Sequence, residues 1–127
     1  MKNRVATASA WGLSLLASLL ISGVDNLAYG GEVSPIVIVA LILAASFALA
    51  YFRDRPWTTA IAVWICIPLT HFAKHIASLA DTLQPNTYRS IALLAGFTLV
   101  VSLAGSGVGT ALRHWTSGSS HPSRSTQ

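Results

Sequence analysis

Four long apolar runs constrain this chain more than any short motif does. The runs cover about residues 5–24, 35–52, 57–79 and 90–112, and almost no charged residue interrupts them. Because an α-helix rises about 1.5 Å per residue, a run of about 20 apolar residues crosses the hydrocarbon core of a bilayer, which is about 30 Å thick. The sequence therefore predicts an all-α integral membrane protein, built as a bundle of four transmembrane helices.

The overall composition excludes an ordinary water-soluble domain. Apolar residues make up 53% of the chain, charged residues only 9%, and the mean hydropathy is +0.59. A soluble domain usually has about 25% charged residues, which cover its surface. The net charge of +4 would suggest a nucleic-acid partner in a soluble protein. Here the basic residues flank the apolar runs, so we expect the lipid bilayer as the partner and no nucleic acid.

The chain is predicted to form one transmembrane domain over residues 1–115, followed by a Ser-rich cytoplasmic tail over 116–127 that we expect to be disordered. Pro35 opens the second apolar run, and Pro56 directly precedes the third. Proline suits the first turn of a helix, where its missing N–H costs no hydrogen bond, and it breaks a helix interior. Both prolines therefore predict helix starts.

The first apolar run has two interpretations. A basic start, here Lys2 and Arg4, followed by an apolar run also describes a secretory signal peptide. Asn26 stands where a cleavage site would need a small residue, and the run is long for a signal core. We favour an uncleaved first transmembrane helix.

The basic residues predict the orientation in the membrane. Six of them fall on one side of a four-helix topology and two on the other: Lys2, Arg4, Arg53, Arg55, Arg113 and Arg124 against Lys74 and Arg89. Cytoplasmic connections carry an excess of lysine and arginine, so both termini are predicted to be cytoplasmic. The chain resembles many small polytopic bacterial proteins, which implies a multi-pass protein of the inner membrane.

A polar patch lies late in the third run, where His71, Lys74 and His75 share one helical face. At about 1.5 Å per residue from Trp57, His71 lies roughly 21 Å into the membrane, in its outer third. Asp25 ends the first run at a similar level. The sequence therefore predicts a candidate polar or ligand site at His71, Lys74, His75 and Asp25, with Lys74 and Asp25 as the first pair to test.

Three interpretations of this patch remain open. The first is structural, with Lys74 reaching the headgroups or pairing with Asp25 while the histidines bond between helices. The second is a metal or proton site, to which Asp25, Glu32 or Asp81 could add a carboxylate. The third is recognition of an anionic lipid or solute. Because the Lys74 ammonium repels a cation, we predict no metal and no cofactor.

Pro68 stands three residues before the patch. It has no N–H to donate to the carbonyl of Trp64, and its ring crowds that carbonyl, so a kink is expected there.

Small residues at helical spacing predict where the helices pack. Thr98, Ser102, Gly105 and Gly109 form one face of the fourth run, and Ala40, Ala44 and Ala48 form a similar face of the second. Small residues let transmembrane helices approach closely. The face of the fourth run is compatible with self-association and with ordinary packing inside the bundle.

These patterns favour a small non-enzymatic membrane protein that acts through helix–helix or partner contacts, as a homo-oligomer or with another membrane protein. The alternative is a small transporter or channel subunit with an outward-facing polar site at His71, Lys74 and His75. The chain has no G-x-S-x-G, H-E-x-x-H or Walker motif, so we assign no catalytic residue.

Overall fold

The computed structural model describes residues 2–26, 34–53, 55–81, 83, 85 and 87–119, and within these every regular element is a helix. The helices are α1 (Lys2–Asn26), α2 (Pro35–Phe52), α3 (Pro56–Trp64), α4 (Cys66–Ile76) and α5 (Tyr88–Gly118). Since α3 and α4 continue one another as a single span, the described chain has four spans long and apolar enough to cross a membrane. The prediction of an all-α chain with four such spans is confirmed.

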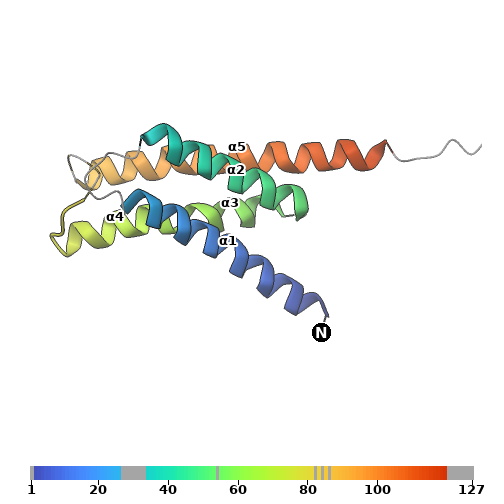
Figure 1. Cartoon of the computed structure of the whole chain (residues 1–127), viewed down its shortest axis with the longest axis horizontal. Coiled ribbons are helices and arrows are strands. Elements are labelled where there is room, and N and C mark those ends of the chain that lie inside the picture. The colour runs from blue at the N-terminus through green and yellow to red at the C-terminus, as the bar shows by residue number, and fades with distance from the viewer. Residues whose placement is uncertain are drawn as a thin grey trace, which may run out of the picture.

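The bundle is built around α5, the longest helix (Figure 1). Helix α2 lies along α5, α3 packs against both of them, and α1 packs mainly against α3 and α4. The start of α1, the end of α2, the start of α3 and the end of α5 lie at one end of the bundle (Figure 1). Arg4, Arg53, Arg55 and Arg113 belong to these helix ends or lie close to them in the chain, so they lie towards the same end of the bundle.

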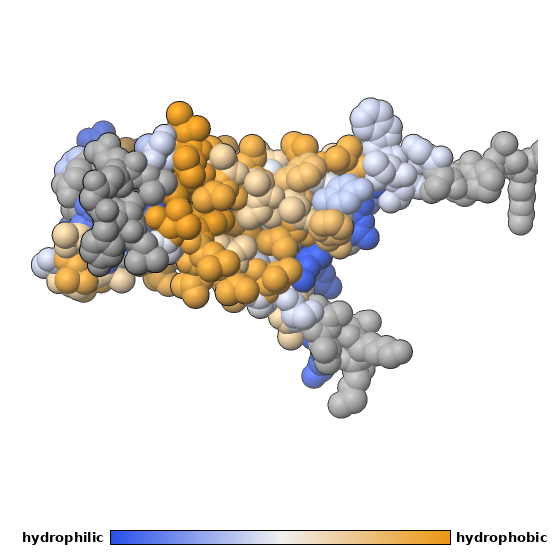
Figure 2. Space-filling view, viewed as in Figure 1, coloured by the Kyte–Doolittle hydropathy of each residue, from blue (hydrophilic) through white to orange (hydrophobic). Residues whose placement is uncertain are grey.

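The surface of the molecule is more apolar, and its interior more polar, than in a soluble bundle. A broad apolar belt crosses the visible face between more polar ends (Figure 2). Inside, buried hydroxyl side chains are as prominent as buried aliphatic ones. Among the residues that the structure describes, eight with a hydroxyl are buried, namely Ser14, Ser18, Ser22, Ser46, Thr59, Thr98, Ser102 and Ser106. Because lipid is as apolar as leucine, large apolar side chains gain nothing by turning inward, whereas hydroxyls gain partners there.

The span that was expected as one helix over 57–79 consists of two helices. The helical hydrogen-bond pattern is interrupted at Ile65, three residues before Pro68, and α4 ends at Ile76 rather than at 79. Pro68 has no N–H for the carbonyl of Trp64, which explains the position of the interruption. Ile65 keeps helical dihedral angles (φ −59°, ψ −36°), so the two helices still form one span.

A tight turn reverses the chain after α4. The N–H of Leu79 donates to the carbonyl of Lys74 at 3.0 Å, and the N–H of Ser78 donates to that of His75 at 3.2 Å. This is the Schellman arrangement of a helix end, which needs a left-handed residue at the position of Ser78. Ser78 has φ +53°, a conformation that glycine adopts without strain and serine does not. The turn sends the chain back towards α4, so that Asp81 reaches His71.

Replacing Ser78 with glycine is therefore expected to stabilise the fold by roughly 1 kcal/mol, because the left-handed conformation costs an L-residue about that much. Thermal unfolding in detergent micelles measures the effect. A matched Ser78→Ala variant keeps the strain and should not gain stability. An equal gain in both variants would contradict this explanation.

The predicted small-residue face of the fourth run lies inside the bundle. Thr98, Ser102, Gly105 and Gly109 are all buried. A Cβ atom placed on Gly105 would lie 2.8 Å from the carbonyl oxygen of Leu43, and one on Gly109 would meet the carbonyl oxygen of Phe47. This face is thus occupied by α2, and self-association through it does not fit the fold.

The corresponding expectation for α2 is wrong. Ala40, Ala44 and Ala48 are exposed, and α2 instead buries Ile38, Ile42, Ser46 and Ala50. The close approach needs small residues on only one of the two helices. Since α5 supplies the glycines, α2 can present larger side chains and leave its alanines outside.

The ends of the helices differ from the predicted bounds. Helix α1 extends over 2–26 rather than 5–24, and α5 over 88–118 rather than 90–112. The expected tail over 116–127 thus begins as helix, and its residues from 120 onward lie outside the described residues.

Candidate functional site

A charged cluster lies at the end of the bundle opposite the basic end, and three segments build it. Helix α4 supplies His71 and Lys74, α1 supplies Asp25 one residue before it ends, and the segment after the Ser78 turn supplies Asp81. We call these four side chains the outer cluster. The helix termini and the Schellman turn bring together residues that are up to 56 positions apart in the chain.

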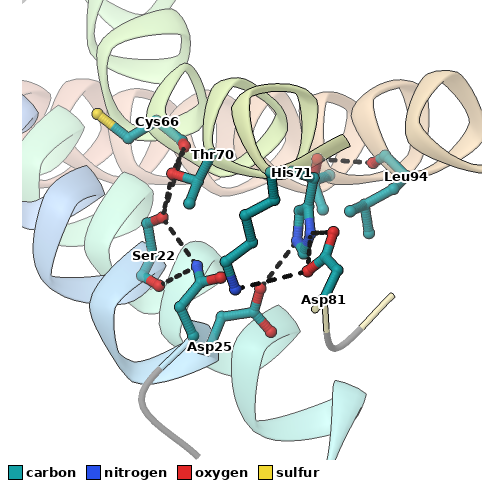
Figure 3. Close-up of polar contacts among 10 residues, drawn as sticks. Ser22, Asp25, Cys66, Thr70, His71, Asp81 and Leu94 are labelled. Atoms are coloured by element: carbon teal, nitrogen blue, oxygen red, sulfur yellow. Dashed lines mark hydrogen bonds and ion pairs between the residues drawn. The ribbon is translucent and has the colours of Figure 1, made fainter. Parts of the chain in front are cut away.

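His71 is the centre of the outer cluster, between the two carboxylates (Figure 3). Its Nε2 lies 2.9 Å from Oδ2 of Asp25, and its Nδ1 lies 2.8 Å from both oxygens of Asp81. The His71 side chain is 2% exposed, the Asp81 side chain 0% and the Asp25 side chain 18%. The imidazole therefore bridges a fully buried carboxylate and one that reaches the edge of the fold.

This geometry determines how many protons the cluster needs. A carboxylate is only an acceptor, and both ring nitrogens of histidine donate only when the imidazole is doubly protonated. With both aspartates ionised, His71 must therefore be an imidazolium. Together with the Lys74 ammonium, the cluster then has two positive and two negative groups and no net charge. Such balance matters because an uncompensated charge away from water costs several kcal/mol.

Lys74 pairs with Asp81, whereas the sequence suggested Asp25 as the first partner to test. Its Nζ lies 3.7 Å from Oδ1 of Asp81, and its side chain is 20% exposed. Asp25 is instead engaged by His71, which lies nearly one turn before Lys74 on α4. The long lysine side chain supports the cluster while its ammonium stays near the edge of the fold.

His75 belongs to a different contact, although it was predicted in the same site. Its ring meets that of Tyr88, at the start of α5, edge to face with centroids 4.3 Å apart. A position four residues after His71 is shifted by about 40° around a helix, and here that shift turns His75 towards α5. His75 therefore links α4 to α5, outside the outer cluster.

Next to the outer cluster, a network of hydroxyl hydrogen bonds joins α1 to α4. The Thr70 hydroxyl donates to the carbonyl of Cys66 at 2.6 Å, so the Ser22 hydroxyl, 2.7 Å from Thr70 Oγ1, is the donor of that pair. One turn before Ser22 on α1, Ser18 Oγ accepts a hydrogen bond from the N–H of Cys66 at 3.1 Å. Side chains of α1 thus bond to the backbone of α4 near the interruption that Pro68 causes.

The arrangement does not provide a metal site. Both ring nitrogens of His71 face carboxylate oxygens at hydrogen-bonding distance, so no lone pair is directed at a shared ion. The described residues contain no group of three or more metal-ligating side chains arranged to hold an ion. Glu32, which was also considered as a ligand, lies outside the described residues.

The central position of Asp81 in the cluster was not predicted from the sequence. Asp81 was named only as one of three carboxylates that could join the site, yet its side chain is the most buried of the cluster. The available signal was its position shortly after His75 in the chain, combined with the small residues Ala77 and Ser78, which permit a tight turn.

Comparison of this chain with protein families, with curated proteins and with solved structures found no match.

Proposed function

We propose that this protein is a small non-enzymatic multi-pass protein of the inner membrane that acts by binding a transmembrane helix of a partner, either a second copy or another membrane protein. The observation that carries the proposal is the course of α1. Its N-terminal half diverges from the other helices (Figure 1).

Most residues of this half whose side chains the structure describes are exposed, although Ala10 is half-buried and the carbonyl of Ser9 accepts a hydrogen bond from Arg53 at 3.5 Å. Ala8, Ser9, Trp11, Gly12 and Leu13 are all exposed, although the segment belongs to an apolar span that begins at Ala8. A Cβ atom on Gly12 would have nothing within 4 Å. The small residues Ala8 and Gly12 are four apart on one face, a spacing that allows a second helix to approach closely.

The outer cluster, at the opposite end of α1, also supports the proposal that the N-terminal half of α1 binds a partner. Its charged groups bind one another and balance in charge, so they hold α1, α4 and the Asp81 segment together. The cluster thereby fixes the C-terminal half of α1 and leaves the N-terminal half available for a partner.

The proposed topology has both termini in the cytoplasm. The arginines at the basic end of the bundle support it, because cytoplasmic connections carry the excess of basic residues. A cysteine introduced at Ser117, in a Cys66→Ser background, should react with an impermeant reagent only from the cytoplasmic side. Reaction only from the opposite side would reverse the orientation.

Two glycines with equally open surroundings test the partner proposal. Gly12 on α1 and Gly96 on α5 both have nothing within 4 Å of a Cβ position, so leucine at either site should leave the isolated fold intact. We expect Gly12→Leu to weaken the complex isolated from native membranes about tenfold or more, the result of a clash of at least 1.4 kcal/mol. Gly96→Leu should leave the complex unchanged.

Native mass spectrometry measures the complex and identifies a second copy or another protein by mass. Photo-crosslinkers at positions 12 and 96 give an independent readout, with crosslinks to a membrane protein expected at position 12. Equal crosslinking at the two positions, or a strict monomer in native membranes, would overturn the proposal.

A second candidate function is a transporter or channel subunit, and the hydroxyl network between the outer cluster and Ser18 favours it. In this role the network would line a path for a polar solute or an ion. Flux into proteoliposomes, compared between wild type and His71→Gln, distinguishes the two candidates, because equal flux removes the cluster from any transport path.

A further inference from the structure

We propose that the outer cluster is a proton-binding site, and that loss of its proton detaches the end of α1 from α4. The inference is independent of the partner proposal, because it concerns the opposite end of α1. It rests on the bridging position of His71 and on the unequal burial of its two carboxylates.

The ligand is one proton on His71. With that proton bound, both ring nitrogens donate, to Asp25 at 2.9 Å and to Asp81 at 2.8 Å. Without it, one nitrogen presents a lone pair to a carboxylate oxygen at the same distance, and the cluster acquires one net negative charge. Both changes are repulsive, and burial prevents water from screening them.

The groups around His71 determine which contact opens. Asp25 faces it from α1, Asp81 from the segment after α4, and Lys74 lies nearly one turn further along α4. The starting turn of α5 carries Tyr88, whose ring contacts His75, and Arg89, which is exposed. Helix α2 has no ionisable side chain near this end, since its only one is Tyr51.

Asp81 keeps its second cationic partner, Lys74, and is fully buried. Asp25 is bonded to the imidazole and is 18% exposed, so it can leave the cluster and gain water. Deprotonation therefore breaks the Asp25–His71 contact and retains the Asp81–His71 contact. The C-terminal end of α1 then separates from α4, and the hydroxyl pair of Ser22 and Thr70 behind it opens.

The proton on His71 determines how the contact between α1 and α4 depends on pH. The closed form, in which Asp25 binds His71, contains the additional proton, so it is present below the titration of the cluster and is lost as the pH rises through that titration. Histidine is suited to this role because modest changes in its surroundings move its charge change across the physiological range.

The test is a distance between two exposed positions measured against pH. Nitroxide labels at Val24 on α1 and Leu79 after α4, in a Cys66→Ser background, report the separation by double electron–electron resonance in nanodiscs. Both residues are well exposed, at 44% and 61%. In the wild type we expect the distance to lengthen by about 2 Å or more between roughly pH 5 and pH 9, in the range of known helix shifts.

Two variants make the result specific to the outer cluster. In Asp25→Asn the amide N–H₂ can donate to a neutral imidazole, so the contact needs no additional proton and the distance should stay short at every pH. In His75→Gln the other nearby histidine is removed, and the wild-type response should persist. A wild-type distance that does not change with pH, the same lengthening in Asp25→Asn, or its loss in His75→Gln would each overturn the proposal.

Discussion

Replacing His71 with leucine is expected to reduce the free energy of unfolding by about 3 to 5 kcal/mol, the usual cost of removing one partner from a buried ionic group. The substitution leaves Asp25 and Asp81 facing each other across an apolar side chain, with Lys74 as the remaining cation of the cluster. The Asp81 side chain is 0% exposed and the Asp25 side chain 18%, so water compensates little. Reversible unfolding in mixed detergent micelles measures the loss.

His75→Leu is the matched control, because it removes the same kind of side chain one turn further along α4. Its ring contact with Tyr88 is worth only about 0.5 to 1.5 kcal/mol, so the effect should be correspondingly small. A third variant separates charge from packing. Adding Asp25→Asn and Asp81→Asn to His71→Leu removes the buried charges and should recover much of the loss. Equal stability of His71→Leu and His75→Leu would show that the outer cluster does not hold the bundle together.

Replacing Gly109 with alanine is expected to reduce the free energy of unfolding by about 1 to 3 kcal/mol, as overpacking of a tight contact does. The added methyl group would meet the carbonyl oxygen of Phe47, and backbone cannot move aside as a flexible side chain can. Helix α2 must therefore shift away from α5, which also strains the 2.8 Å contact between the hydroxyls of Ser46 and Ser102. Gly105→Ala should behave in the same way, because its Cβ would lie 2.8 Å from the carbonyl oxygen of Leu43.

Gly107 on the same helix provides the control. A Cβ atom there has nothing within 4 Å, so Gly107→Ala should be neutral or should stabilise α5 by up to about 1 kcal/mol through helix propensity. The measurement is again reversible unfolding in micelles. If Gly109→Ala were as stable as Gly107→Ala, the close approach of α2 to α5 would not be a source of stability.

Proline positions show how much local structure could be predicted from the sequence. Pro35 and Pro56 begin α2 and α3, as their missing N–H groups require, and Pro68 explains the interruption at Ile65. These outcomes depend on covalent structure within one turn of helix, so no tertiary information is needed. The end of α4 at Ile76 depends instead on the conformation of Ser78, which the sequence alone does not indicate.

The pairing of charged groups in the outer cluster could not be predicted from the sequence. Helical spacing placed His71, Lys74 and His75 together, and rise per residue placed Asp25 at their level. Which carboxylate meets which cation depends on the relative rotation of α1 and α4 and on the turn after α4. A rotation of about 40° separates His71 from His75 on their helix, and that was enough to give the two histidines different partners.

The sequence by itself determined that this chain is helical and has four spans that suit a membrane, because the length of an apolar run and its lack of charge act locally. Only the tertiary structure decided that α2 occupies the glycine face of α5 and that His71, rather than Lys74, binds Asp25. The physical reason is that hydrogen bonds and close contacts are short-ranged. They depend on which faces of separate helices meet, and in a lipid-facing bundle apolar patterning does not specify those faces.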